Sequence, residues 1–214
     1  MKRAAPLGKA EWRCQLPEAR KPQSSETRAR PRSVAKVAVQ LVAPQLSWAT
    51  RFSAEEARLA EALDGKMRRV EHIGSTAVLG LMAKDVVDIL VAVDHFDLDS
   101  EYFSALEPLG YEFRPDPEDP EHRLFHLNDS TLRRLVNLHI CVAGTEWERD
   151  RIAFRDALRD DAALRIKYQA LKLSLAEQYD NAQEYADAKG PFITSALSGG
   201  EASPNLDNSL ETAE

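Results

Sequence analysis

The chain has 214 residues, of which 43% are hydrophobic, and its formal net charge is −7. This size suits one sizeable domain with tails, and the negative charge argues against a general nucleic-acid-binding protein. No apolar run approaches the roughly 20 residues that span a bilayer, so we expect no membrane segment. The two cysteines, Cys14 and Cys141, make no disulfide framework, which predicts a reducing, cytoplasmic location.

Charge divides the chain into three parts. Residues 1–33 carry nine Lys/Arg and three Glu, a net charge of +6 that leaves −13 for the remainder. This segment is rich in Arg, Pro and Ser without apolar periodicity, so we predict a disordered basic extension. A transit peptide is the alternative, although its glutamates oppose it. The polar stretch 198–214 predicts a disordered acidic tail, and the folded domain is expected over 34–197.

The folded part opens with a predicted strand and a predicted helix. The β-branched run "VAKVAVQLV" at 34–42 favours a strand that ends before Pro44. The segment 52–63 then favours a helix, with Ser53 and Glu56 spaced as a capping box.

The sequence patterns between residues 68 and 143 indicate mostly strands. The sequence "RRVEHI" at 68–73 favours a strand, and "VVDILVAV" at 86–93 favours a central, covered one. After these we expect one helix and then three more strands, at 97–110, 111–115, 123–127 and 133–143.

From Trp147 onward the pattern becomes helical. Apolar residues recur at helical spacing in two consecutive segments, and a short helix with Pro191 in its first turn is expected near the end. A half that mixes strands and helices, followed by a helical half, predicts an α+β fold in which helices pack on a mixed β-sheet.

The turn at Gly74 and Ser75 is the first candidate for chemistry. A strand that ends in Gly-Ser can turn sharply and direct backbone N–H groups and a hydroxyl at an anion. Alone the pair is a weak signal, because most Gly-Ser pairs only make turns.

Asp88 is the second candidate, since it lies inside an apolar run. Side chains alternate along a strand, so Asp88 shares a face with Leu90. A carboxylate there costs several kcal/mol unless it is paired or binds a metal ion. Two interpretations are open: a structural acceptor held by Lys84, Arg69 or a backbone turn, or a metal ligand.

A Gly-Ser turn followed by an aspartate on the next strand resembles the plan of the polymerase-beta-like nucleotidyltransferases. The stretch 71–93, "EHIGSTAVLGLMAKDVVDILVAV", is more closely similar to the signature of the GrpB family. Downstream, "NLHICVAGTEWERDRIAFRDALRD", "ALKLSLAEQY" and "YADAKGPFI" resemble that family's His-containing strand, Phe-Arg-Asp helix, Leu-Lys helix and closing segment. The resemblance covers about 39–197 and implies a nucleotidyltransferase-like fold.

The resemblance also implies a phosphate site and a metal. In the superfamily the Gly-Ser turn holds triphosphate oxygens, and carboxylates on adjacent strands hold Mg²⁺. Phosphate binding is therefore implied for Gly74, Ser75 and Thr76, and Mg²⁺ binding for Asp88.

The implied metal set is incomplete in this sequence. Leu90 stands where the superfamily has its second carboxylate. Glu71 and His139 are the replacement ligands that neighbouring strands offer, although Mg²⁺ prefers oxygen. For His139 the alternative is a core histidine bonded to Asp88 or to a carbonyl.

Phosphate recognition also needs several cations that converge on one cleft. Lys84 lies on the loop between the turn and Asp88, so we predict that Lys84, Asp88 and His139 form the catalytic set. Basic residues elsewhere complete the candidates: Lys172, Lys189 and Arg123 for phosphate binding, with Arg51 and Arg155 as further basic side chains.

Two functional hypotheses follow. The first is an enzyme that uses a nucleoside triphosphate and Mg²⁺ to transfer a nucleotidyl group to a small acceptor, or to adenylate it. The second is a non-catalytic nucleotide-binding or partner-binding module, which the substitution at Leu90 favours.

Overall fold

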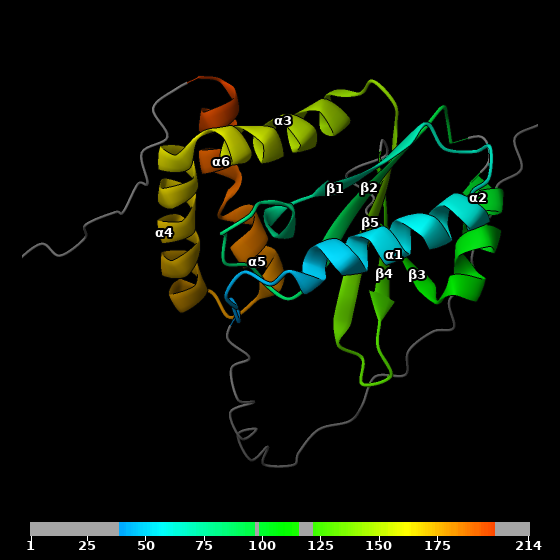
Figure 1. The fold of residues 1–214 in the computed structure, drawn as a ribbon, viewed down its shortest axis with the longest axis horizontal. Coiled ribbons are helices and arrows are strands. Elements are labelled where there is room, and N and C mark those ends of the chain that lie inside the picture. The colour runs from blue at the N-terminus through cyan, green and yellow to red at the C-terminus, as the bar shows by residue number, and fades with distance from the viewer. Residues whose placement is uncertain (1–38, 97–98, 116–121, 200–214) are drawn as a thin grey trace, which may run out of the picture. The chain divides into compact units, whose positions relative to one another are not determined.

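The computed structural model describes residues 39–96, 99–115 and 122–199. The described first half contains these elements: α1 (Ser47–Ala62), β1 (Arg69–Ile73), the 3-10 turn η1 (Ser75–Ala77), β2 (Val87–Val93), α2 (Asp99–Leu106), the 3-10 turn η2 (Glu107–Leu109), β3 (Tyr111–Arg114), β4 (His122–Asn128) and β5 (Arg134–Val142). The second half is helical (Figure 1): α3 (Glu146–Asp160), α4 (Ala162–Gln178), α5 (Ala182–Asp187) and α6 (Gly190–Leu197). The predicted extension at 1–33, and all but two residues of the predicted tail at 198–214, lie outside the described residues.

The described strands form one mixed sheet in the order β1-β2-β5-β4-β3. β2 and β5 are parallel, and every other neighbouring pair is antiparallel. β2 is an interior strand with six of its seven residues buried, as its apolar run predicted. The arrangement confirms the predicted α+β fold with a mixed sheet and a helical second half.

Side-chain alternation gives the sheet one apolar face and one mixed face. We call the mixed face the polar face because it carries Asp88, Asn137 and His139, although Leu90, Ala92 and Cys141 form a small buried apolar cluster on it. On the apolar face Ile89 and Val91 pack in the main core with Trp48 of α1 and Tyr102 of α2. Each large side chain that is fully buried there contributes about 1.5–3 kcal/mol. Asp88 points to the opposite face, where α3 contacts β1 and β5.

The predicted strand at 34–42 is wrong for the residues that the structure describes. Residues 39–42 contribute a single bridge, in which Val42 and Ala83 exchange two backbone hydrogen bonds of 2.8 and 3.2 Å. The ladder ends there because its partner segment turns at once, with Val86 N–H donating to the Lys84 carbonyl. Pro44, which has no N–H, closes the other side.

The predicted capping box is also wrong, because α1 begins at Ser47 rather than at Ser53. Trp48 extends the helix: its ring is buried in the main core, and its Nε1–H donates to Asp85 Oδ1 over 3.0 Å. Ser53 therefore lies inside the helix, where its side chain cannot cap the first turn. Tertiary packing outweighed the local capping signal here.

A second core fixes the helical half to the segment after the Gly-Ser turn. Val78 and Leu81 pack with Leu158 of α3, Tyr168 of α4 and Phe192 of α6. These contacts hold the loop between β1 and β2 against α3, α4 and α6. Side chains on these helices can therefore reach the Gly-Ser turn.

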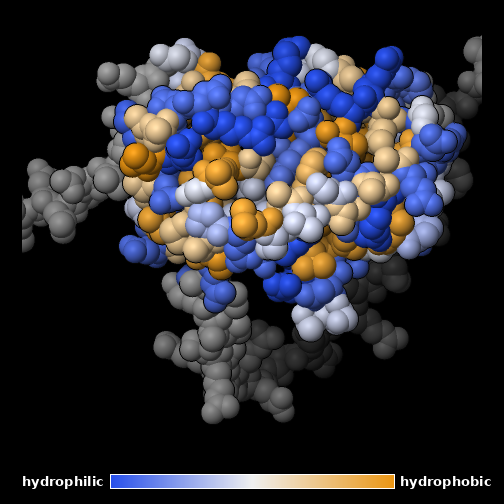
Figure 2. Space-filling view, in the orientation of Figure 1, coloured by the Kyte–Doolittle hydropathy of each residue, from blue (hydrophilic) through white to orange (hydrophobic). Residues whose placement is uncertain are grey.

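After Trp147 the structure has the two consecutive helices and the short last helix that the sequence predicted, and α5 is a further helix that the apolar spacing did not predict. Pro191 lies in the first turn of α6. The exposed side of α3 is strongly hydrophilic (Figure 2), in line with its many charged residues. Among the described residues, no helix combines the length and the apolar character needed to cross a membrane.

Candidate functional site

Gly74 brings the turn into direct contact with Asp88. β1 and β2 pair Ile73 with Asp88, so the next residue passes beside the carboxylate. Gly74 has a φ of +69°, and a Cβ added there would lie 2.3 Å from Asp88 Oδ2. Only glycine allows this approach, and the predicted turn and the predicted aspartate therefore share one site.

Asp88 lies on the polar face of the sheet with 28% of its side chain exposed. Asn137 Nδ2 donates to Asp88 Oδ1 over 2.7 Å, and His139 Nε2 lies 3.9 Å from the same oxygen. Burial raises the pKa of Asp88, but His139, Asn137 and the charge of Lys84 outweigh it and hold the pKa below its ordinary value. The carboxyl group is therefore ionised beside the turn.

A histidine pair continues from Asp88 along the polar face. His139 Nδ1 and His122 Nε2 are 2.8 Å apart, and Trp147 of α3 stacks on the His122 ring with the centroids 4.4 Å apart. Burial, aided by the neighbouring His139, lowers the pKa of His122 to about 3, so its ring is neutral. The structure thus places His139 between Asp88 and a neutral imidazole.

Three lysines from separate elements converge on this turn, and we call Lys84, Lys172 and Lys189 the lysine cluster. Lys172 of α4 is 1% exposed. Its Nζ donates to Ser75 Oγ over 3.2 Å and to the Met82 carbonyl. Lys84 lies on the loop before β2 and Lys189 just before α6.

Two tyrosine rings hold the lysine cluster in place. The Nζ atoms of Lys84 and Lys189 lie 5.6 and 4.5 Å from the ring centroid of Tyr185. Lys172 Nζ lies 5.2 Å from the ring centroid of Tyr168. These are cation–π distances, so aromatic faces stand where carboxylate partners would be expected.

Desolvation and mutual repulsion lower the pKa values of the lysine cluster. Burial, with the charge of Lys189 adding to it, lowers the pKa of Lys172 to about 7. Burial and the charge of Lys84 lower the pKa of Lys189 to about 8, although Asp88 opposes the shift. Burial likewise lowers the pKa of Lys84.

The cluster has an excess of positive charge. No ammonium group of the cluster forms an ion pair with a carboxylate in the described part of the chain. Arg134 acts electrostatically on Lys84, and Arg151 on Lys189. Asp88 and, near Lys189, Asp187 are the carboxylates that act on the cluster in the described residues. Such an arrangement is suited to a multiply charged anion.

Glu71 and Leu90 do not complete a metal centre with Asp88. Glu71 Oε2 accepts from Arg155 Nη1 over 2.7 Å, and Leu90 is fully buried. Within the described ranges, no group of three or more His, Cys, Asp or Glu side chains could hold a metal ion. One carboxylate whose Oδ1 already accepts an amide N–H does not fit the Mg²⁺ centre that the resemblance implied.

Two predicted phosphate-binding residues are not brought to the cluster. Arg123 lies on the face of β4 opposite His122, with its guanidinium 4.1 Å from the ring centroid of Phe96. Thr76 is buried, with its Oγ1 3.0 Å from His72 Nε2. The further basic side chains are held by carboxylates: Arg51 by Asp85, and Arg155 by Glu71 and Asp156. Arg69, considered above as a structural partner of Asp88, pairs with Glu148 instead.

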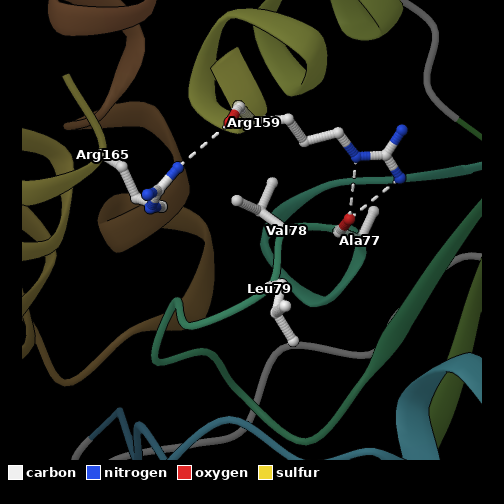
Figure 3. A pocket seen from close by; sticks show the side chains of 5 residues that line it. All are labelled: Ala77, Val78, Leu79, Arg159 and Arg165. Carbon is white, nitrogen blue, oxygen red and sulfur yellow. Dashed lines mark hydrogen bonds between the residues drawn. The ribbon is translucent and has the colours of Figure 1, made fainter. Parts of the chain in front are cut away.

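A cavity of about 390 Å³ beside η1 has a structural role. Its lining is formed by Ala77, Val78, Leu79, Arg159 and Arg165 (Figure 3). Arg159 donates to the Ala77 carbonyl over 3.1 and 2.9 Å, and Arg165 donates to the Leu158 carbonyl over 2.8 Å. The two guanidinium groups therefore fasten η1 and the end of α3 instead of facing a ligand.

The sequence reasoning missed Asn137, His122 and Tyr185. Asn137 could have been found, because it lies two positions before His139 on the same strand and hence on the same face. Tyr185 lies four positions before Lys189, a helical spacing that signals contact. The link between His122 and His139 depends on the register of β4 and β5, for which the sequence gives no signal.

The fold and the site together define an α+β protein with a cluster of three lysines at the Gly-Ser turn. The model of the family described as "GrpB protein" matches residues 38–198, and the chain belongs to the GrpB family. The predicted resemblance is therefore confirmed.

Individual relatives agree with this assignment. A UPF0157 protein of Streptomyces coelicolor is 39% identical over 68% of this chain and 75% of its own. The crystal structure of the conserved protein GrpB from Enterococcus faecalis aligns with a TM-score of 0.68 and 27% identity, covering 75% of this chain and 96% of that one. The Cid1 poly(U) polymerase aligns with a TM-score of 0.45 and 14% identity over 63% of this chain and 43% of that one, a likeness too slight to bear on the assignment.

Proposed function

We propose that this protein binds a nucleoside triphosphate at the Gly74–Ser75 turn, with its phosphates on the lysine cluster, and transfers a nucleotidyl group to a small acceptor. The observation that supports the proposal is the convergence of three buried or half-buried ammonium groups, none with a described carboxylate partner, on one turn. Burying cations without partners is costly, so their retention is best explained by an anionic ligand.

The proposed transfer assigns a task to each group at the turn. An acceptor oxygen or nitrogen would form a bond to the α-phosphorus, while the bond from that phosphorus to the bridging oxygen breaks and pyrophosphate leaves. The lysine cluster would stabilise the negative charge on pyrophosphate. Asp88, ionised and backed by His139, would accept the proton of the acceptor.

A non-catalytic nucleotide-binding module is the second candidate. Leu90 and the Glu71–Arg155 ion pair favour it, because both remove carboxylates that metal-assisted transfer would use. The lysine cluster is required by both candidates, and the two differ in turnover.

Thermal unfolding with ATP, followed by an assay of pyrophosphate release, tests the proposal. ATP at about 100 times its dissociation constant should stabilise the protein by about 2.7 kcal/mol. The variant Lys189→Gln should lose the shift, whereas Lys167→Gln, at an exposed position of α4, should keep it. Binding with pyrophosphate release on addition of an acceptor supports the enzyme. Binding without release across a panel of hydroxyl and amine acceptors supports the module, and no shift with any nucleotide rejects both.

A further inference from the structure

We infer that the Gly74–Ser75 turn binds the polyphosphate chain of the nucleotide as a free anion, with the lysine cluster supplying the positive charge that a divalent metal ion would otherwise provide. The inference rests on the proposed function and adds the ionic form of the ligand. It departs from the Mg²⁺ dependence that the sequence predicted.

The first reason is that the carboxylates near the turn are already engaged. Asp88 Oδ1 accepts from Asn137 over 2.7 Å, and Oδ2 lies against Gly74, where a Cβ would come within 2.3 Å. Glu71 is bound to Arg155. A Mg²⁺ ion retains waters and adds one or two carboxylates and phosphate oxygens in near-octahedral geometry. Of the two Asp88 oxygens, Oδ2 is the one left without a described donor, so this carboxylate would hold such an ion by a single atom.

The second reason is the positive charge of the lysine cluster. Lys84, Lys172 and Lys189 face a small number of described carboxylates, of which Asp88 is the one beside the turn. A divalent cation placed among these ammonium groups would meet repulsion at short range in a poorly solvated site. A triphosphate without Mg²⁺ keeps more negative charge than its Mg²⁺ complex, so the lysine cluster should bind the free form more tightly.

The third reason is the hydrogen bonding of Lys172. An ammonium group has three N–H donors, and Lys172 uses donors on Ser75 Oγ and the Met82 carbonyl while it is 1% exposed. Ser75 is the first residue of η1 and directly follows Gly74, which is exposed. A phosphate oxygen at the turn could thus be bound through Ser75 and Lys172 together, with no space required for an intervening hydrated metal ion.

Calorimetric titration of the full chain with ATP, once in EDTA and once in excess Mg²⁺, tests the inference. We expect the dissociation constant for ATP to be about tenfold lower in EDTA than in Mg²⁺. The reason is that bound Mg²⁺ cancels two negative charges of the triphosphate and so weakens its attraction to the lysine cluster, an effect that solvent screening reduces to this size. Equal or tighter binding in Mg²⁺ would overturn the inference and leave the proposed nucleotide binding standing. No binding in either condition would remove both.

The variant Asp88→Asn gives a test with opposite signs for the two alternatives. If Asp88 is only an anion beside the phosphates, removing its charge should tighten the binding of free ATP by about three- to tenfold. If it is a metal ligand, the same variant should weaken the binding of ATP in Mg²⁺, which would count against the inference. Circular dichroism checks that the variant is folded. If it is not, the titrations of the wild-type chain with ATP in EDTA and in Mg²⁺ decide between the two alternatives.

Inorganic triphosphate identifies the part of the ligand that is recognised. It should compete with ATP in EDTA, because the cluster contacts phosphates. The variant Lys172→Met should lose at least about tenfold in affinity for both anions, while Lys167→Met on the same helix should leave both unchanged. Failure of inorganic triphosphate to compete, or equal effects of the two variants, would overturn the inference.

Discussion

Lys172 is the residue at which the proposed phosphate binding would most clearly cost stability. It is 1% exposed and donates to a hydroxyl and a carbonyl, with no described carboxylate beside it. Replacing a buried ion pair by apolar side chains of similar volume is often neutral or stabilising by about 1–4 kcal/mol, and a buried charge without a carboxylate partner is costlier to keep than a pair. We therefore expect Lys172→Met to raise the free energy of unfolding at pH 6 by about 1 kcal/mol, in the same variant that loses ATP. Urea unfolding measures it, and a destabilised variant would show that the ammonium group has a structural role.

Gly74 offers a second prediction at the same scale, because its backbone conformation and its contact with Asp88 both exclude a side chain. Gly74→Ala should lower the free energy of unfolding by about 3 kcal/mol. Of this, about 1–2 kcal/mol comes from a backbone conformation, φ 69° and ψ −170°, that is essentially restricted to glycine, and the rest comes from the clash at 2.3 Å. Gly80→Ala is the matched control, since Gly80 has a φ of +83° but nothing within 4 Å of an added Cβ. It should cost about 1 kcal/mol. Equal losses would mean that Asp88 moves aside freely.

The loop between η1 and β2 is the element that carries Lys84 into the site, and Asp85 fastens it. The Asp85 carboxylate accepts from Trp48 Nε1 over 3.0 Å, pairs with Arg51 Nη2 over 3.1 Å and with Arg133 Nη1 over 3.0 Å. It thereby joins α1, the hairpin between β4 and β5, and the loop. Burial raises the pKa of Asp85, but these donors outweigh burial and hold the pKa below its ordinary value.

Removing this carboxylate should loosen the loop and with it the lysine cluster. We expect Asp85→Ala to cost about 2 kcal/mol in unfolding free energy and to weaken ATP binding several-fold through Lys84. Asp94→Ala is the control, because Asp94 pairs with Arg68 where both side chains are more than half exposed, and it should cost under about 0.5 kcal/mol. Urea unfolding and calorimetry measure the two effects. Weakened stability with unchanged affinity would separate the loop from the site.

The elements also show how far the sequence could predict this protein. The apolar run of β2 fixed the strand and the face of Asp88, because alternation is local. The extent of α1 was mispredicted, since Trp48 is anchored by Asp85, 37 positions away. The prediction of Arg123 as a phosphate-binding residue needs it to lie on the same face of the sheet as Asp88. The pattern at 123–127 does not reveal which face of this strand is apolar, and in the structure Arg123 lies on the other face from His122. Local physics was predictable, and contacts across the sheet were not.

At the scale of the whole molecule, the lysine cluster brings together positive charges from the helical half and from the loop that precedes β2. Lys172 comes from α4, Lys189 from the start of α6 and Lys84 from the loop before β2. The groups that face them are Ser75, Met82, Asp88, Arg134, Arg151, Tyr168, Tyr185 and Asp187. An anion bound at the cluster would therefore hold both halves together, and the protonation of the cluster should control both stability and affinity.

These two properties should change in opposite directions with pH. The pKa of Lys172 falls from 10.5 to about 7 on folding, so above pH 7 and up to about 10 the unfolded chain binds more protons than the folded one. The stability of the free protein should consequently rise with pH over this window. The affinity for ATP should instead fall, by about tenfold or more between pH 7 and 9, as Lys172 and Lys189, whose pKa is about 8, lose their charges. Urea unfolding and calorimetry across this range, repeated with Lys172→Met, measure both slopes. Because the pKa of Lys189 also falls on folding, to about 8, Lys172→Met should keep only part of the rise in stability. An undiminished rise in the variant would show that Lys172 does not cause it, and parallel slopes in the wild-type protein would mean that the anion binds elsewhere.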